Sequence, residues 1–417
     1  MKLLRCVPLL AAISLVSACG GGHSSTPAPA ATPADPGNQT SIDSNVPSDP
    51  GPATPPPIAT PPITTPPIAT PPGATTPPGT DYALDSVDWL EPVVQQTSDE
   101  GFALTAARAV QVRAMVTTPG TEKPAPRVRI KISDSAGTVL ASADMSGPAS
   151  VKPAADRSSI AVNFVYPLKA EWIKPGLKVN IVANPDGLAS DPTPANNSAD
   201  LAPAVNPAAV MYVTAVPVTT EAEGTAILPR SGSGDAATRA QIRSTLMAMY
   251  PLSDVKVRLH APYKMTSLTT MRGNWGLMLG EINKLRSAEG NHGHYIGFIP
   301  HSPLGSTTTG NSFMPGTAAT AMGAANPTDW RSGNVQHEIG HNFNLGHVPC
   351  APIGAAGEIG YDAEQKSIVP LDARNNMMSY CGPAWISKAN YTATQRRLTQ
   401  YGLDKPDGVT IPLTEWQ

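Results

Sequence analysis

The stretch His337-Glu-Ile-Gly-His-Asn-Phe-Asn-Leu-Gly-His347 holds three of the eight histidines in a chain of 417 residues. His337 and His341 are four residues apart, so on a helix both imidazoles lie on one face and can reach the same metal ion. Glu338 is the next residue round the helix, where its carboxylate can take a proton from a water molecule at the metal. This spacing predicts a helix that carries two metal ligands and a general base.

The third histidine requires the chain to turn back. His347 lies six residues beyond His341, a spacing that takes it off the shared face of a continuous helix. Asn344 is the second choice after glycine for a left-handed turn, and Gly346 adds further freedom. Three neutral histidines leave one tetrahedral position open, which is typical of a catalytic zinc site. A surface helix with satisfied histidines does not explain the glutamate, the spacing and the turn together.

This stretch resembles the metzincin zinc-peptidase motif HExxHxxGxxH, with Asn344 where that family usually has glycine. A metzincin also has a Met-turn downstream, and Asn376-Met-Met-Ser-Tyr-Cys381 fits it. The resemblance implies that Met378 forms an apolar floor under the zinc, although alone it would be read as a core methionine. It also implies that Tyr380 can ligate zinc and swing to stabilise an oxyanion.

The resemblance implies a zinc metalloendopeptidase with one catalytic Zn²⁺, held by His337, His341 and His347. The fold it implies is α/β: a metzincin-like mixed sheet with a zinc-site helix. An extended protein or glycoprotein substrate would pair with an edge strand within residues 312–325. Within metzincins the stretch looks most like the ToxR-regulated lipoprotein type, which includes proteases that act on mucin-like O-glycoproteins.

The N-terminus predicts export. Lys2 and Arg5 precede an apolar run, Val7 to Ala18, that is too short to span a membrane. Small residues before Cys19 resemble the bacterial lipobox, which implies cleavage before Cys19 and lipidation of its thiol. The alternative is an ordinary signal peptide followed by a chance cysteine. The expected location is the bacterial cell envelope, anchored in the outer membrane through Cys19, or else extracellular.

The four cysteines then divide simply. Cys6 leaves with the signal and Cys19 carries lipid, so Cys350 and Cys381 remain as a pair in an oxidising setting. We expect them to form a disulfide that ties the two halves of the site together; the alternative is two free thiols.

Composition divides the chain into four parts. A signal peptide, residues 1–18, is followed at 19–80 by the lipidated cysteine and a Pro/Thr-rich tether, in which a Thr-Pro-Pro unit recurs. A docking ligand is the alternative for the tether. A β-rich accessory domain at 81–207 and the zinc-peptidase domain at 208–417 follow. Only 15% of residues are charged and the net charge is −3. There is no basic stripe for nucleic acid.

The accessory region predicts an immunoglobulin-like β-sandwich. Alternating apolar runs separated by turn residues indicate its strands, at 109–116, 128–132, 160–165 and 177–182. The expected role is a spacer or support, with substrate or glycan binding as the alternative.

The last region predicts strands and helices that alternate into a mixed sheet. Strands are expected at 210–218, 255–259 and 295–299, an edge strand within the Gly/Thr/Ala-rich residues 306–325, and helices at 235–250 (capped by Asp235) and 275–288 before the motif helix.

Two weaker candidates remain outside the motif. His292 and His294 could form a second metal site, but His260, His292, His294 and His301 read more simply as surface or loop residues. Asp362 could bind calcium or order its loop. The sequence favours a peptidase. The alternatives are a non-catalytic zinc-containing lipoprotein that binds peptides or glycopeptides, and a surface protein with structural zinc.

Overall fold

The computed structural model describes residues 15–20, 79–230, 232–300, 308–323 and 334–417. Most of the predicted signal peptide and tether, and His301, lie outside these ranges. Residues 79–417 belong to one compact unit, so the predicted domain boundary at 207/208 stays a prediction. Within the described residues, no helix is both long enough and apolar enough to cross a membrane.

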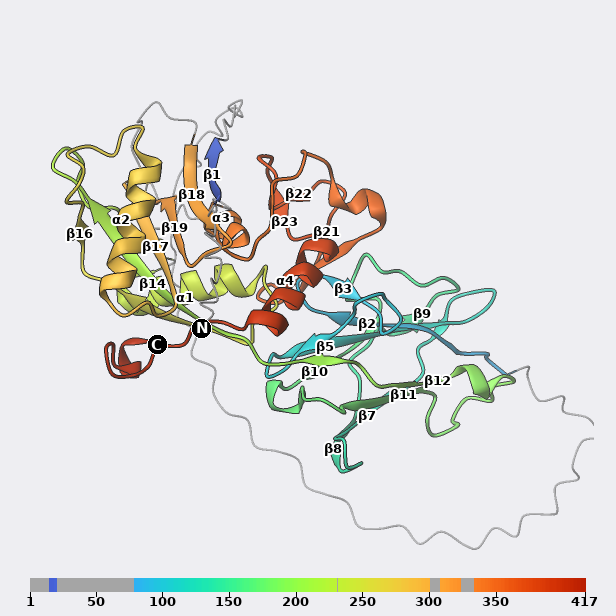
Figure 1. Ribbon diagram of the computed structural model, residues 1–417. Helices are drawn as coiled ribbons and strands as arrows, with labels where there is room; N and C mark the ends of the chain where they lie inside the picture. The colour runs from blue at the N-terminus through green and yellow to red at the C-terminus, as the bar shows by residue number, and fades with distance from the viewer. Residues whose placement is uncertain (1–14, 21–78, 231, 301–307, 324–333) are drawn as a thin grey trace, which may run out of the picture. The chain divides into compact units, whose positions relative to one another are not determined.

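Residues 83–206 contain a β-sandwich of two antiparallel four-stranded sheets (Figure 1). One sheet has the order β10-β5-β2-β3 and the other β12-β11-β7-β8. Their strands are β2 (Ala83–Leu90), β3 (Val94–Gln95), β5 (Val110–Thr117), β7 (Val128–Ser133), β8 (Val139–Asp144), β10 (Phe164–Leu168), β11 (Lys178–Ala183) and β12 (Ser198–Leu201). Short ribbons pair β4 (Leu104–Thr105) with β13 (Val205–Asn206), and β6 (Lys123–Pro124) with β9 (Ser150–Val151).

Alternate residues of both sheets point inward and share one core. Val112 of β5 packs in the same cluster as Ile130 and Ile132 of β7 and Val179 and Ile181 of β11, and all five are almost fully buried. This alternation is the pattern of sheets that bury one face. The predicted sandwich is therefore confirmed.

One predicted strand of the sandwich is wrong over most of its length. Residues 160–163 form a bend and turn, and β10 begins only at Phe164. The Asn163 side chain donates hydrogen bonds to the carbonyls of Asp156 and Ser159, both at 2.7 Å. These bonds hold the segment in a compact turn and compete with an extended conformation.

Residues 210–322 form a mixed sheet, with residues 15–20 added at one edge. Its order is β1-β18-β19-β17-β14-β15, and β16 also pairs with β14. Strands β14, β15, β17 and β19 run parallel to one another, whereas β18 pairs antiparallel with β19 and β1 antiparallel with β18. The strands are β1 (Leu15–Gly20), β14 (Val210–Thr219), β15 (Asp254–Leu259), β16 (Tyr263–Lys264), β17 (His294–Ile299), β18 (Thr308–Met314) and β19 (Ala318–Met322).

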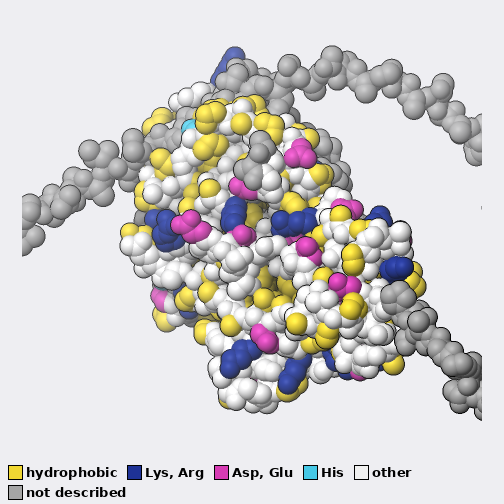
Figure 2. All heavy atoms as spheres, turned by 90° about the vertical axis from the view of Figure 1, so that its right-hand side faces the viewer, with side chains coloured by type: hydrophobic (Ala, Val, Ile, Leu, Met, Phe, Trp, Pro, Cys, Tyr) yellow, Lys and Arg dark blue, Asp and Glu magenta, His cyan; other side chains and the backbone are white. Residues whose placement is uncertain are grey.

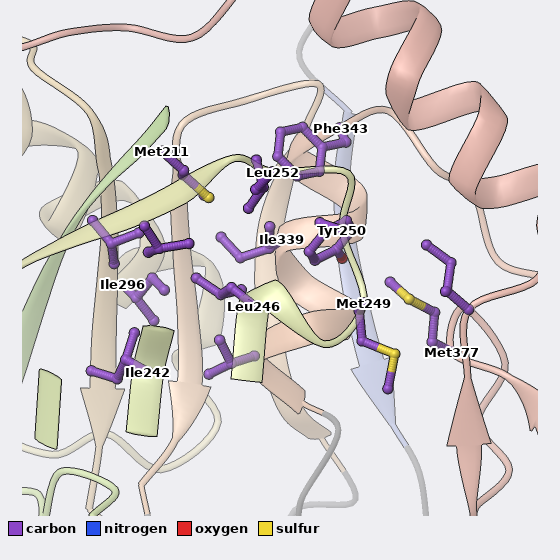
Figure 3. Packing of buried hydrophobic residues seen from close by; sticks show 14 of the residues in the cluster. Met211, Ile242, Leu246, Met249, Tyr250, Leu252, Ile296, Ile339, Phe343 and Met377 are labelled. Atoms are coloured by element: carbon purple, nitrogen blue, oxygen red, sulfur yellow. The ribbon is translucent and has the colours of Figure 1, made fainter. Parts of the chain in front are cut away.

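Helices cover both faces of this sheet, as a parallel sheet requires. α1 (Gly234–Met247) and α3 (Asn334–Asn342) share a core with Val213 and Ala215 of β14, and Figure 3 shows Ile242, Leu246 and Ile339 in that core. α2 (Trp275–Ala288) packs with Val216 and Val218 on the opposite face. The α/β mixed sheet expected from the sequence is confirmed.

The first helix differs from its predicted bounds. Ser233, not Asp235, is the N-cap residue, and the helix ends at Met247 rather than at Tyr250. Pro251 explains the early end, because the residue before a proline is disfavoured in a helical conformation.

After α3 the chain forms two short two-stranded ribbons and a last helix. β20 (Ile359–Asp362) pairs with β21 (Ser367–Pro370), and β22 (Asn375–Asn376) pairs with β23 (Ala384–Trp385). α4 (Lys388–Tyr401) follows and lies against the sandwich. Its amide Gln395 Nε2 donates to the carbonyl of Ala103 at 2.6 Å. Single 3₁₀ turns are η1 (Ala170–Trp172), η2 (Pro194–Asn196), η3 (Ile353–Ala356) and η4 (Leu413–Glu415).

Candidate metal centre

α3 carries His337, Glu338 and His341, and all three side chains are buried. The helix packs through Val335 and Ile339 into the core beneath the mixed sheet. The two histidines therefore share the remaining face, with their ring centroids 4.8 Å apart. The structure thus has the helix that the spacing predicts.

The chain turns back after α3, as the sequence requires. Asn344 has φ of 68°, the left-handed conformation. Its amide donates to the carbonyl of His341 at 2.8 Å, and the amide of Leu345 donates to the carbonyl of Gly340 at 2.9 Å. These bonds terminate the helix as a left-handed cap does. The turn brings His347 to a ring-centroid distance of 4.5 Å from His341.

The three imidazoles converge on one point. One ligand nitrogen from each histidine lies within 4.8 Å of the others, and the Nε2 atoms of His341 and His347 are 3.0 Å apart. The Nε2 atom of His337 is buried and has no hydrogen-bond partner among the residues that the structure describes. A buried nitrogen left in this way is costly unless something binds it, so this trio is suited to hold a metal ion.

The other ring nitrogens are already engaged. Nδ1 of His337 lies 2.8 Å from the carbonyl of Met377, and Nδ1 of His341 lies 2.8 Å from the carbonyl of Leu345. A carbonyl can only accept, so each Nδ1 carries the proton and each Nε2 presents its lone pair. These are the outer contacts that orient metal-binding histidines.

Burial also favours the neutral form of these rings. Burial lowers the pKa of His337 to about 4, assisted by repulsion from His341. Burial lowers the pKa of His341 to about 4 as well, against the effect of its bond to Leu345, and it lowers the pKa of the more exposed His347. Neutral imidazole is the form that binds metal.

Glu338 is held by the neighbouring strand β18. The hydroxyl of Ser312 donates to Glu338 Oε2 at 2.8 Å, and both residues are buried. A Cβ at Gly310 would overlap Glu338 Oε1, so this position of the strand has to be glycine. The sequence did not indicate that Ser312 and Gly310 contact Glu338, because a serine and a glycine in a Gly/Thr/Ala-rich stretch form no motif of recognisable spacing.

The predicted Met-turn lies directly against α3. Met378 is fully buried, and a Cβ at Gly340 would overlap its sulfur, so helix and turn are in close contact. The half-exposed Tyr380 places its hydroxyl 3.1 Å from Nδ1 and 3.2 Å from Nε2 of His347. The structure therefore brings Met378 and Tyr380 to the trio, as the sequence predicts.

A disulfide joins Cys350 and Cys381, as predicted. It connects the chain just beyond His347 to the chain just beyond Tyr380. The bond therefore closes a loop that contains the whole Met-turn.

The remaining candidates lie away from the trio. His294 is fully buried at the start of β17, and burial lowers its pKa to about 3, so its assignment to a surface or loop is wrong. His260 and His292 each contact a carboxylate, at 3.1 Å from Glu289 and 3.3 Å from Asp407. Nothing in the sequence around His294 indicated that its side chain would be buried in the core.

Asp362 orders its own turn. Its Oδ1 accepts hydrogen bonds from the amides of Glu364 and Gln365, both at 2.9 Å. This geometry fits the loop-ordering alternative for Asp362.

The sandwich surface carries two hollows and mixed charge. The hollows measure about 600 and 420 Å³, and both are lined by sandwich residues rather than by the histidine trio. On the face shown in Figure 2, lysine and arginine side chains lie among aspartate and glutamate side chains.

Comparison with protein-family models and with curated proteins gave no match. Among solved structures, the chain is similar to the CARDB domain of the PF1109 protein from Pyrococcus furiosus, in complex with di-metal ions. The sequences are 12% identical, the match covers 32% of this chain and 94% of that domain, and the TM-score is 0.20. A likeness at this TM-score carries no argument about this chain.

Proposed function

We propose that this chain is a zinc-dependent endopeptidase, with His337, His341 and His347 as the zinc ligands and Glu338 as the general base. One observation carries the proposal. Nε2 of His337 has no hydrogen-bond partner among the described residues and lies in the same cluster as the nitrogens of His341 and His347, while Nδ1 of both helical histidines is occupied by a carbonyl. Three neutral imidazole nitrogens are the protein donor set of many catalytic zinc sites, which keep a further position for water or substrate.

Zinc, when bound, supplies Lewis-acid activation of a water molecule and of the substrate carbonyl. The Glu338 carboxylate accepts the proton of that water and then gives it to the leaving amine. Ser312 orients the carboxylate through Oε2. The Tyr380 hydroxyl contacts His347 and its side chain is half-exposed, a position from which we propose that it donates to the developing oxyanion.

The arrangement around the trio supports a metzincin-type peptidase. A helix with the HExxH spacing, a left-handed turn at Asn344 and a buried Met378 against Gly340 occur together. Each is expected from the family resemblance. The ToxR-regulated lipoprotein type, with O-glycoproteins as a substrate class, is part of the proposal and rests on the sequence resemblance.

An extended peptide would bind along β18. In support, the backbone of Leu15–Gly20 already pairs antiparallel with this strand, and Ser17 lies opposite Ser312. The outer edge of β18 therefore accepts an extended chain next to Glu338. We propose that lipoprotein processing before Cys19 removes residues 15–18 and leaves this edge open to substrate. Lipid on Cys19 would then hold the enzyme at the bacterial outer membrane.

The test is proteolysis by the processed lipoprotein, which begins at Cys19, purified in detergent, with zinc content measured in parallel. Casein and a densely O-glycosylated mucin would be offered to wild type and to Glu338→Ala. We expect about one zinc in each protein and cleavage by wild type alone; mucin cut in preference to casein would support the subfamily. Zinc without cleavage would favour the non-catalytic binding lipoprotein. Wild type without zinc would refute the proposal.

A further inference from the structure

Two separate paths of contacts lead from the β-sandwich to His337. We propose that the sandwich is a working part of the metal centre, because it positions His337 through Trp385 on one side and through Tyr250 on the other. Metal affinity should therefore depend on contacts made by residues far from the ligands. The inference needs the trio to bind a metal ion, but it does not need the chain to hydrolyse peptides.

The first path runs through Trp385. Its indole Nε1 donates at 2.7 Å to the carbonyl of Pro92, two residues beyond the sandwich strand β2. The carbonyl of Trp385 accepts from the amide of Met377 at 2.8 Å, and the carbonyl of Met377 accepts from Nδ1 of His337 at 2.8 Å. A displacement of the indole would therefore shift the carbonyl that orients the ligand ring.

The indole is fixed from its other side as well. A Cβ at Gly360 would lie 2.6 Å from Trp385 Nε1, so the backbone of β20 packs directly on the ring. Gly360 also bridges to Val93, and the amide of Tyr361 donates to the same Pro92 carbonyl at 3.2 Å. The residues just after β2 and the strand β20 thus hold the indole between them.

The second path runs through Arg108, a buried residue of the sandwich. Its guanidinium donates to the carbonyls of Tyr250 at 2.7 Å, Leu252 at 2.9 Å and Met247 at 2.8 Å. These carbonyls lie at and just beyond the end of α1, where free acceptors concentrate. Arg108 therefore fixes the segment that carries Tyr250.

Tyr250 connects the segment that Arg108 holds to the helix α3. Its hydroxyl donates to the carbonyl of Gln336, the residue before His337. Its ring packs edge-on against Phe343, with centroids 5.0 Å apart, and Figure 3 shows it beside Ile339. The backbone that carries the first ligand is thus held at Gln336, while the ring of the same ligand is held at Met377.

The test measures zinc affinity by competition with a chromophoric chelator on the full chain in detergent. Trp385→Phe removes the indole N–H and keeps a ring in place. Partners that orient a ligand histidine typically change metal affinity tenfold to a hundredfold. Trp385 is one hydrogen bond further from His337 than such a partner, because Met377 lies between them, so we expect about threefold to tenfold weaker zinc binding. Arg108→Met should weaken it as well.

Trp89→Phe is the matched control. Trp89 is a buried indole of β2 that donates to Thr97 at 2.9 Å, and this hydrogen bond belongs to neither path. We expect its zinc affinity to stay within about twofold of wild type, since a loss of fold stability alone does not reposition His337.

Thermodynamic linkage between zinc binding and sandwich stability allows a second measurement, made on the wild-type protein alone. If the sandwich supports zinc binding, zinc must reciprocally stabilise the sandwich. Zinc should then slow amide hydrogen exchange in β5, none of whose residues belongs to the trio. Unchanged zinc affinity in Trp385→Phe, with β5 exchange indifferent to zinc, would overturn the inference and leave the peptidase proposal intact. Wild type that binds no zinc would overturn both.

Discussion

The hydroxyl of Ser312 donates to the carboxylate of Glu338 across 2.8 Å, between the strand β18 and the helix α3. Both side chains are buried. A hydrogen bond to a charged group in such a place is worth about 1.5–3 kcal/mol. It keeps one carboxylate oxygen occupied while the other faces Gly310. Strand β18 therefore does more than line the site, because it sets the direction in which the proposed general base points.

Replacing Ser312 with alanine should therefore reduce turnover without removing zinc. The carboxylate would keep its charge but lose its fixed orientation, and we expect kcat to fall about tenfold, with KM changed little. Steady-state kinetics with zinc analysis would measure this. Thr320→Val is the control, since Thr320 is a buried hydroxyl on the next strand that bonds the Asn311 carbonyl instead. Equal turnover in Ser312→Ala and wild type would show that the bond does not orient the base.

Gly310→Ala should be more damaging than Ser312→Ala. The added Cβ would occupy the space of Glu338 Oε1, so either the strand or the carboxylate must move. A misplaced base typically costs about a hundredfold in rate. Gly280→Ala is a fair comparison, since a Cβ there would meet nothing within 4 Å and α2 carries none of the trio. If Gly310→Ala turned over as fast as Gly280→Ala, the close contact would have no functional role.

Asn344 should tolerate glycine but not valine. It adopts φ of 68°, which a β-branched residue reaches only with strain of about 1–3 kcal/mol. The same turn presents the Leu345 carbonyl to Nδ1 of His341, so strain there also disturbs a ligand. We expect Asn344→Val to lower both the free energy of unfolding and zinc affinity, and Asn344→Gly to match wild type. Urea titrations with and without zinc would measure both. Similar losses in the two variants would mean that the Asn344 side chain, not the backbone angle, matters.

The trio was predictable because its information is local. The spacing of His337 and His341, and an asparagine where the chain must reverse, follow from helix geometry alone. The helix at Trp275–Ala288 was also predicted with its bounds correct. The sequence prediction was wrong where one residue disfavours the expected element. Pro251 follows the early end of α1, and the Asn163 side chain holds residues 160–163 in a turn instead of a strand.

Contacts between distant segments could not be predicted from local pattern. Ser312 meets Glu338 across 26 residues of sequence, and Trp385 meets Pro92 across 293. Neither pair has a spacing signature, because the meeting depends on how strands and helices pack. For the same reason the sequence separated the sandwich from the mixed sheet, whereas Arg108 joins them through three backbone carbonyls.

Removing the disulfide should destabilise the fold more than it affects zinc binding. Cys350 and Cys381 are 31 residues apart, and a cross-link over a loop of that size contributes about 3 kcal/mol. The double variant Cys350→Ser with Cys381→Ser should lose about that much free energy of unfolding. Zinc should restore part of it, since an ion bound by the trio, which includes His347, would stabilise the folded form alone. Denaturant titrations with zinc and with a chelator would measure both effects. An unchanged midpoint in the chelated form would contradict the prediction.

Glu91 should make the folded protein less stable as pH rises through the weakly acidic range. Burial raises the pKa of this carboxyl to about 7, even though Arg108 lies 3.6 Å away and lowers it. Its ordinary pKa is 4.5, so between about pH 4.5 and 7 the folded chain holds a proton that the unfolded chain has lost. The stability contributed by neutral Glu91 is therefore present at low pH and is lost as pH rises to about 7. Carboxyls with lowered pKa values, such as Glu281 at about 2, act in the opposite sense and mostly below this range.

Glu91→Gln isolates this effect, because the amide keeps the shape and cannot ionise. We expect the wild type to lose on the order of 2 kcal/mol of unfolding free energy between about pH 5 and pH 8 relative to this variant. Urea titrations across that range would give the difference, with Glu171→Gln, an exposed sandwich position, as the control. Parallel pH curves for wild type and Glu91→Gln would mean that Glu91 is ionised throughout and forms a true ion pair with Arg108. In that case the Arg108 guanidinium, which bonds three backbone carbonyls of the mixed-sheet region, would also be held by the charge of Glu91.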